Sequence, residues 1–192
     1  TARLLAMALN CERGPTATPC GECAACRAVV AGTSLAVIEI DAASTGGVDD
    51  IRNIRAAAAL GTIGGRYKIY ILDEAHQITK EGANALLKTL EEPPEHAVFV
   101  LATTEPYKLP DTIRSRAQRF DFHPIGSETL ISYLGDIAGR ERYQAAPDGL
   151  ALIARHARGS VRDALGLLEQ VAALGGGKAH GRGATRAPAL PP

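Results

Sequence analysis

Four cysteines lie close together in the sequence and could bind one metal ion. They are Cys11, Cys20, Cys23 and Cys26, a C-x8-C-x2-C-x2-C pattern, and the chain has no others. Thiolates separated by two residues can share one tetrahedral Zn²⁺, and Gly21 allows the chain to turn tightly around it. Disulfides or unrelated buried thiols are the alternatives, but no secretory signal opens the chain, which favours metal binding. Because four cysteines leave no open coordination position, the pattern predicts a structural zinc site.

Two acidic residues, Asp73 and Glu74, directly follow an apolar run in the stretch 69–76 (IYILDEAH). In nucleoside-triphosphatases of the P-loop type, the first carboxylate after such a strand holds Mg²⁺ and the second polarises the attacking water. The alternative is that the acids only cap the next turn, which is common and makes the pair weak evidence by itself.

Further polar side chains could serve the same chemistry. Thr103 and Thr104 are expected at the end of the next strand, where a hydroxyl could contact a γ-phosphate; threonine also simply favours strands. Arg116 and Arg162 could neutralise charge on a transferring phosphoryl group, in their own subunit or in a neighbour. Each arginine taken alone is better explained as a surface residue or an ion-pair partner.

The elements that must position these side chains alternate between strands and helices. Short apolar runs predict buried strands, and apolar residues at helical spacing predict helices. The helices are expected at 1–10, 48–60 and 79–92, and the strands at 35–41, 67–73 and 97–104. This alternation predicts a parallel α/β sheet that helices cover on both faces.

The pattern changes near residue 127. Helical spacing without intervening strands predicts three helices, at 128–138, 148–158 and 160–174. The predicted organisation is an α/β nucleotide-binding domain at 1–126 with a zinc module inserted at 11–26, then a helical lid domain at 127–174. Residues 175–192, rich in Gly, Ala, Pro and Arg, are predicted to be a disordered tail.

Composition excludes few classes of protein. The apolar fraction of 46% is enough for a packed core, and equal numbers of basic and acidic residues, 21 each, give no indication of nucleic-acid binding. The apolar runs are too short to span a bilayer, so a cytoplasmic protein without membrane contact is expected.

The motifs together resemble one family. Residues 1 to about 174 resemble the gamma/tau subunits of bacterial DNA polymerase III, which are clamp-loader ATPases of the AAA+ class. The matching stretches are PCGECAACRAV, IEIDAAS, YILDEAH, NALLKTLEEPPEH, LATTEP and GSVRDAL.

The resemblance implies a role for each matching residue. Asp73 and Glu74 match the magnesium-binding and catalytic acids, and Thr104, with Thr103 beside it, matches the sensor of the γ-phosphate. Arg116 matches the arginine finger that completes the ATP site of a neighbouring subunit, although Ala117 replaces the cysteine usual after it. Arg162 matches the second sensor in the lid. The four cysteines match the zinc ligands, and His76 closes the D-E-A-H box without being expected to bind metal or to catalyse.

The resemblance also implies the protein's partners and cofactors. It implies a subunit of the DNA-directed DNA polymerase holoenzyme, a nucleotidyltransferase, that uses ATP and Mg²⁺ to load a sliding clamp onto primed DNA. The expected partners are other gamma/tau, delta and delta-prime subunits in a hetero-oligomer, together with the clamp and DNA.

The 192 residues contain no G-x-x-x-x-G-K-[ST] phosphate loop, and the first helix starts at Thr1 without a capping residue. We therefore expect a fragment that starts just after this loop, lacks the first strand and binds ATP poorly. A non-catalytic delta-prime-type subunit, which also carries a finger arginine, is the alternative, and the pair Asp73 and Glu74 argues against it. A stand-alone zinc-binding interaction module is a third possibility, which would leave the sensor and finger positions unexplained.

Overall fold

Strands and helices alternate in the first half of the chain. A computed structural model describes residues 1–174 and 178–179, and it divides the chain into two units, Thr1–Arg119 and Phe120–Pro192. The sequence predicted the division seven residues later, so the segment 120–126 is grouped with the second unit instead of the first.

A three-stranded sheet forms the centre of the first unit. Its strands are β1 (Val37–Asp41), β2 (Lys68–Asp73) and β3 (Ala97–Leu101), in the order β1-β2-β3 and all parallel. Asp41 is the register partner of Asp73, so the carboxyl ends of β1 and β2 coincide. The predicted parallel sheet is confirmed, with acidic residues at one edge.

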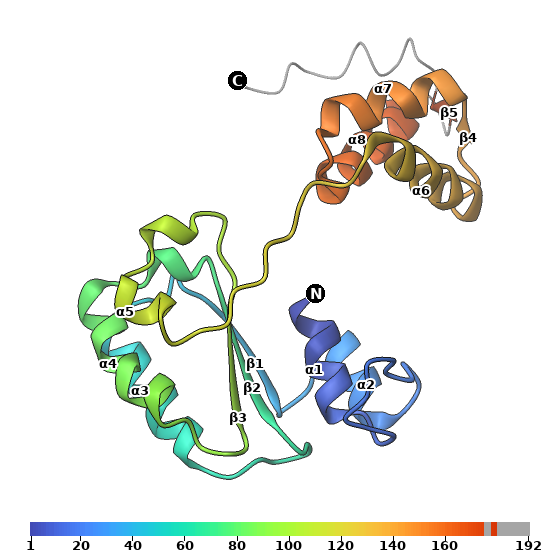
Figure 1. The fold of residues 1–192 in the computed structure, drawn as a ribbon. Coiled ribbons are helices and arrows are strands. Elements are labelled where there is room, and N and C mark those ends of the chain that lie inside the picture. Colours follow the sequence, from blue (N-terminus) through green and yellow to red (C-terminus); the bar gives the residue numbers. More distant parts are fainter. Residues whose placement is uncertain (175–177, 180–192) are drawn as a thin grey trace. The chain divides into compact units, whose positions relative to one another are not determined.

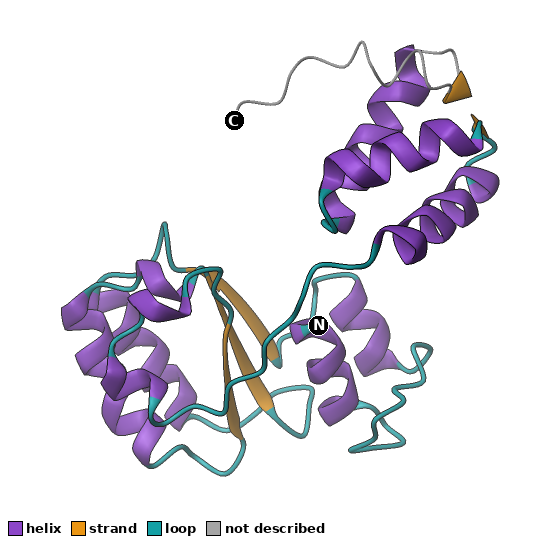
Figure 2. Ribbon diagram, turned by 45° about the horizontal axis from the view of Figure 1, so that its top comes forward, coloured by secondary structure: helices purple, strands orange, loops and turns teal. Residues whose placement is uncertain are grey.

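Helices cover both faces of this sheet, as predicted. Figures 1 and 2 show α3 (Val48–Ala59) and α4 (Lys80–Glu91) on one side and α1 (Ala2–Asn10) and α2 (Ala24–Val30) on the other. Because successive side chains of a strand point to opposite faces, β2 contributes to both cores. Tyr70 and Leu72 pack with α3 and α4, whereas Ile69 and Ile71 pack with α1 and α2.

Local chemistry explains where α4 begins and how closely it lies to α3. Thr79 caps α4, because its hydroxyl accepts a hydrogen bond from the backbone N–H of Gly82 at 3.0 Å. A Cβ atom on Gly82 would lie 2.8 Å from the carbonyl oxygen of Gly46 and 3.2 Å from Cγ1 of Ile51. Glycine is therefore required for α4 to pack this closely against α3 and the loop before it.

Four short helices and the end of β3 differ from the sequence prediction. The elements η1 (Ala75–Gln77), η2 (Pro106–Lys108) and α5 (Asp111–Arg114) were not predicted, and neither was α2. The prediction that Thr103 and Thr104 end a strand is wrong, because β3 ends at Leu101. Ala102 still pairs with the neighbouring segment, since its N–H donates to the Leu72 carbonyl at 2.9 Å and its carbonyl accepts the Ala75 N–H at 2.8 Å, and the threonines lie in the loop beyond it.

The second unit is helical. Its helices are α6 (Ser127–Arg140), α7 (Pro147–Ala157) and α8 (Val161–Leu174), which pack around a core that includes Leu130, Leu134, Ile153 and Leu168. The three predicted lid helices are therefore present. Most of the predicted tail at 175–192 lies outside the described residues, but Lys178–Ala179 form a short strand, β5, parallel to β4 (Gln144–Ala145). None of the described helices is long and apolar enough to cross a membrane.

Candidate active site and metal centre

The acidic residues after β2 form the first part of the candidate site. Asp73 is the last residue of β2 and is exposed, and one oxygen of its carboxylate accepts a hydrogen bond from the Glu74 N–H at 3.0 Å. Glu74 has φ 47° and ψ 44°, in the left-handed region that residues with a side chain rarely adopt. Such backbone strain is common at functional sites, and here it turns the chain sharply at the sheet edge.

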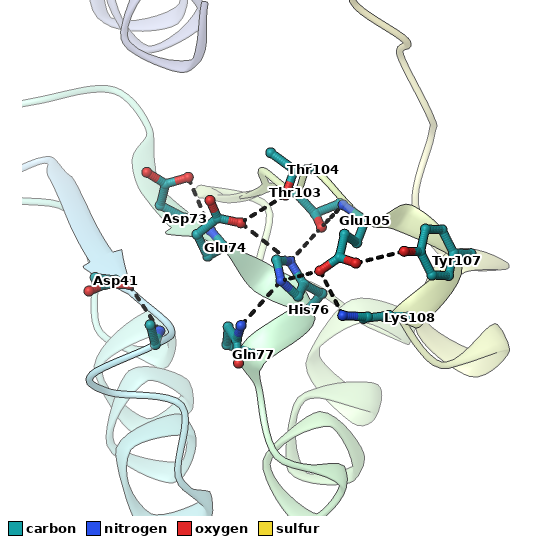
Figure 3. A network of polar contacts seen from close by, with 11 residues as sticks. Asp41, Asp73, Glu74, His76, Gln77, Thr103, Thr104, Glu105, Tyr107 and Lys108 are labelled. Carbon is teal, nitrogen blue, oxygen red and sulfur yellow. Dashed lines mark hydrogen bonds and ion pairs between the residues drawn. The ribbon is translucent and has the colours of Figure 1, made fainter. Parts of the chain in front are cut away.

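The Glu74 carboxylate contacts two neighbours across the sheet edge (Figure 3). Its Oε2 accepts a hydrogen bond from the Thr104 hydroxyl at 3.4 Å and lies 3.3 Å from Nδ1 of His76. Glu74 directly follows β2 and Thr104 lies in the loop after β3, so the parallel order of these neighbouring strands brings the two sequence-predicted residues together. The Glu74 side chain remains 42% exposed, which leaves it accessible to a ligand.

Thr103 contacts His76 and not Glu74. Its Oγ1 lies 2.9 Å from Nδ1 of His76 and accepts the backbone N–H of Glu105 at 3.0 Å. His76 is thus in contact with both Glu74 and the loop after β3, although the sequence analysis gave it no role. The only sequence signal was its place in the D-E-A-H stretch.

Asp41, at the end of β1, was not among the predicted residues. Its carboxylate accepts the backbone N–H of Ala43 at 2.9 Å and the hydroxyl of Ser44 at 3.2 Å, so it closes the turn after β1. Its position beside Asp73 was not visible in the sequence, because register between strands depends on tertiary structure.

Arg116 lies after α5 and is held by its own unit. Its Nε and Nη2 atoms both donate to Oε1 of Glu91, at 2.9 and 2.5 Å, and its Nη1 donates to the Thr112 carbonyl at 2.7 Å and the Ser115 hydroxyl at 3.3 Å. These contacts use four of the five N–H groups of the guanidinium. No described contact joins Arg116 to Asp73 or Glu74, so in its own unit its acidic partner is Glu91.

Arg162 lies in the second unit, in the first turn of α8, and is exposed. The acids belong to the first unit.

The four cysteine sulfurs come together as predicted. They lie within 4.8 Å of one another, and none forms a disulfide. A tetrahedral site with Zn–S bonds of about 2.3 Å needs sulfurs roughly 3.8 Å apart, and Sγ of Cys11 and Sγ of Cys20 are 3.7 Å apart. The donor set therefore fits Zn²⁺, and among the described residues no other group of three or more His, Cys, Asp or Glu side chains is arranged to hold a metal.

Two helix ends position the cysteines. Cys11 directly follows α1, while Cys23 caps α2 by accepting the Cys26 N–H at 3.4 Å. Hydrogen bonds from the backbone N–H groups of Glu12 and Cys26 lower the pKa of Cys23 to about 6, and burial raises the pKa of Cys26 to about 12. Hydrogen-bond donors thus favour a thiolate at one ligand, and the buried thiol needs a cation nearby to ionise.

Family comparisons match the chain in two parts. Residues 1–126 match a model described as "DNA polymerase III, delta subunit". Residues 130–177 match the model of the ATPase lid domain of the DNA polymerase III clamp loader subunit.

Individual relatives are similar over most of the chain. The DNA polymerase III subunit tau of Bacillus subtilis is 49% identical over 175 residues, which are 91% of this chain and 31% of the relative. The subunit tau of Escherichia coli is 48% identical over 177 residues, 92% of this chain and 28% of the relative. The chain thus spans less than a third of the length of these relatives.

A solved structure shares the fold. The RuvB Holliday junction branch migration motor of Thermotoga maritima has a TM-score of 0.65 and 18% identity over 84% of this chain and 54% of its own. At this identity the likeness concerns the fold, which agrees with the predicted AAA+ architecture.

Proposed function

Because the chain belongs to the gamma/tau family of DNA polymerase III clamp-loader subunits, we propose that it is part of a subunit that hydrolyses ATP. ATP hydrolysis would drive the loading of a sliding clamp onto primed DNA, and the subunit would act in a hetero-oligomer with other clamp-loader subunits. The chain spans less than a third of the tau relatives, so these activities are proposed for the whole protein of which its residues form a part.

One observation supports the proposal most directly, namely the contact between Glu74 and Thr104 at the carboxyl edge of the sheet. An ATPase of this type needs a carboxylate to polarise water and a hydroxyl near the γ-phosphate, supplied by neighbouring strands. Glu74 is assigned the first role and Thr104, with Thr103 beside it, the second. The exposed carboxylate of Asp73 offers the hard oxygen donor that Mg²⁺ prefers, and Mg²⁺ would neutralise phosphate charge there.

Arg116 is proposed to act on the ATP site of a neighbouring subunit. Its guanidinium has no described contact with Asp73 or Glu74 and its side chain is 32% exposed, as an arginine that acts in trans requires. A phosphate of the neighbour would have to replace Glu91 as its partner, which is feasible because exposed ion pairs contribute only about 0–1 kcal/mol. Arg162 is proposed to sense the nucleotide from the lid.

The zinc site is proposed to be structural. Its four thiols leave no position for a substrate, and they join α1 to α2 on the face of the sheet opposite to α3 and α4.

The first experiment replaces Glu74 in the assembled loader, with the full-length subunit. Glu74→Gln should lower ATP turnover by about 10²- to 10⁴-fold while nucleotide binding is retained, because only the carboxylate that polarises water is lost. Glu95→Gln is the matched control, since Glu95 is exposed in the turn before β3. Unchanged turnover in the Glu74 variant would exclude a catalytic role for this acid.

The same variant tests the second candidate, a delta-prime-type subunit that donates a finger without hydrolysing ATP. This second candidate is considered because residues 1–126 match a delta-subunit model. In that case Glu74→Gln would have no effect, while Arg116→Ala would still lower hydrolysis in the neighbour by about 10³- to 10⁵-fold. Arg114→Ala is the control for Arg116, because Arg114 is the last residue of α5, two residues before Arg116, and pairs with Asp111.

A further inference from the structure

His76 is a nearly buried side chain at the edge of the sheet, and the proposed roles of the acids and threonines do not use it. It lies on η1, and its imidazole is only 6% exposed. Figure 3 shows the ring between the segment after β2 and the loop after β3.

The Nδ1 side of the ring faces the proposed catalytic machinery. Nδ1 lies 3.3 Å from Oε2 of Glu74 and 2.9 Å from Oγ1 of Thr103. The same Thr103 oxygen accepts the backbone N–H of Glu105, so the ring is linked to the backbone of the loop through one hydroxyl.

The Nε2 side faces an acid that other groups hold in place. Nε2 lies 3.1 Å from Oε2 of Glu105 and 3.3 Å from Nε2 of Gln77. Tyr107 and Lys108 donate hydrogen bonds to the Glu105 carboxylate at 2.6 and 2.8 Å, and the Lys108 ammonium and the Tyr107 hydroxyl lower the pKa of Glu105. Glu105 is therefore an ionised acceptor in a defined position, against which the ring can be oriented.

The Glu74 side chain has few other constraints. It is 42% exposed, and apart from the ring its only hydrogen-bond partner among the described residues is the Thr104 hydroxyl at 3.4 Å. An exposed carboxylate with one long hydrogen bond can adopt several rotamers, and reaction rates are sensitive to misplacement of such a group by about 1 Å.

We propose that His76 is a positioning residue that links the Glu74 carboxylate to the 103–105 loop, so that the position of the loop determines the position of the carboxylate. This inference rests on the proposed role of Glu74. In this arrangement a contact of Thr103 or Thr104 with a phosphate would be transmitted to Glu74 through the ring.

A ring that merely fills space would give a different result, and two conservative variants separate the two roles. The amide of an asparagine can occupy the place of Nδ1, and that of a glutamine the place of Nε2. His76→Asn therefore keeps contact with Glu74 and Thr103, whereas His76→Gln keeps contact with Glu105 only. If His76 positions Glu74, the asparagine variant retains the function better.

The first measurement needs no nucleotide and uses the chain as it is. Hydrogen exchange of the Glu105 amide reports on its hydrogen bond to the Thr103 hydroxyl. His76→Ala should speed this exchange by about fivefold, and His76→Asn should speed it by less. His156→Ala is the control, since this histidine is exposed on α7. Equal exchange in the parent chain and in His76→Ala would overturn the proposed link.

The second measurement is steady-state hydrolysis in the assembled loader with the full-length subunit. His76→Ala should lower kcat by about 10- to 100-fold with little change in nucleotide affinity, and His76→Asn should retain more activity than His76→Gln. If Glu74→Gln abolishes turnover but the alanine variant is normal, or the asparagine and glutamine variants are equal, the role of His76 is wrong and that of Glu74 stands. If Glu74→Gln itself has no effect, the proposed function fails, and the positioning role of His76 that rests on it fails too. Faster exchange of the Glu105 amide in His76→Ala would then show only that His76 links the two segments structurally.

Discussion

The two faces of the sheet are packed with different kinds of side chain, and β2 contributes to both. Tyr70 and Leu72 pack against α3 and α4 in a core of aliphatic side chains such as Ile51 and Leu86, all almost fully buried. On the opposite face, Ile69 and Ile71 pack against α1 and α2 in a cluster that includes the four cysteines.

The difference shows what the cysteines contribute. The helices α1 and α2 have nine and seven residues, and apart from Cys26 only three of their apolar side chains are buried: Ala6, Met7 and Val29. Such short helices bury too little apolar surface to be stable by packing alone. We therefore expect the face covered by α1 and α2 to be stabilised mainly by metal binding, and the face covered by α3 and α4 mainly by packing.

Loss of the metal should have the largest effect. Cys26→Ser, or removal of zinc by a chelator, should destabilise the α1–α2 face by more than about 5 kcal/mol, because structural zinc sites contribute about 10–16 kcal/mol of binding energy. Hydrogen exchange should increase across α1 and α2 before α3 and α4, and zinc content should fall in parallel. Val29→Ala, which alters the same face but keeps every thiol, should retain its zinc. A chain without metal that melts like the parent would refute the structural role of zinc.

A cavity on the other face should have a smaller effect. Leu86 is completely buried on α4, so Leu86→Ala should lower the free energy of unfolding by about 2–5 kcal/mol, as measured by urea titration. Leu87→Ala is the control on the same helix. Because Leu87 is only half-buried, this substitution should lower the free energy of unfolding by less. Zinc content should not change in either variant. If Leu86→Ala released zinc, metal binding at one face would depend on packing at the other, and the two faces would not be stabilised independently.

Tyr70→Phe should change stability in the opposite direction. The Tyr70 hydroxyl is buried without a hydrogen-bond partner among the described residues, while the ring stacks on Phe99 with centroids 5.1 Å apart. Removing an unsatisfied polar group while keeping the ring should stabilise the unit by about 1 kcal/mol in thermal unfolding. Tyr107→Phe, which loses the hydrogen bond to Glu105, should be neutral or slightly destabilising. A clear loss of stability in Tyr70→Phe would reveal a partner for this hydroxyl.

The ion pair between Arg3 and Glu39 should have the smallest effect. It joins α1 to β1 through two hydrogen bonds of 2.5 and 2.7 Å, but the side chains are 55% and 40% exposed, so Arg3→Ala should lower the free energy of unfolding only slightly.

The same pair predicts a dependence on pH. The hydrogen bond from Arg3 lowers the pKa of Glu39 below its unfolded value, and burial opposes this only in part. The stabilisation is therefore present above the unfolded pKa of the carboxyl and is lost as pH falls through its lowered folded pKa. Urea titrations should show the parent and Arg3→Ala differing near neutral pH and converging in acid; a difference that persists in acid would mean that packing of the Arg3 stem, and not charge, is lost.

Long elements with a clear pattern could be predicted from the sequence. The helices α3, α4, α6, α7 and α8 and the strands β1 and β2 are present within a few residues of their predicted ends. The exception among the long elements is β3, whose predicted end at Thr104 ignored the loop that the Thr103 hydroxyl closes. The helix α2 was missed, because its residues lie in a cysteine-rich stretch without apolar periodicity.

The sequence by itself determined the chemistry available to this protein. The four cysteines were identifiable as metal ligands from residue type and spacing, because metal ligation restricts both. The acids Asp73 and Glu74 and the threonines of the next loop were assigned roles only with the family resemblance. The parallel order of strands followed from their alternation with helices.

Only the tertiary structure decided which of these side chains meet. It brought Thr104, and not Thr103, to Glu74, placed Arg116 on Glu91, and put His76 between two acids. These contacts depend on the register of neighbouring strands and on where β3 ends. Both are set by packing between segments far apart in the chain, which no local pattern encodes.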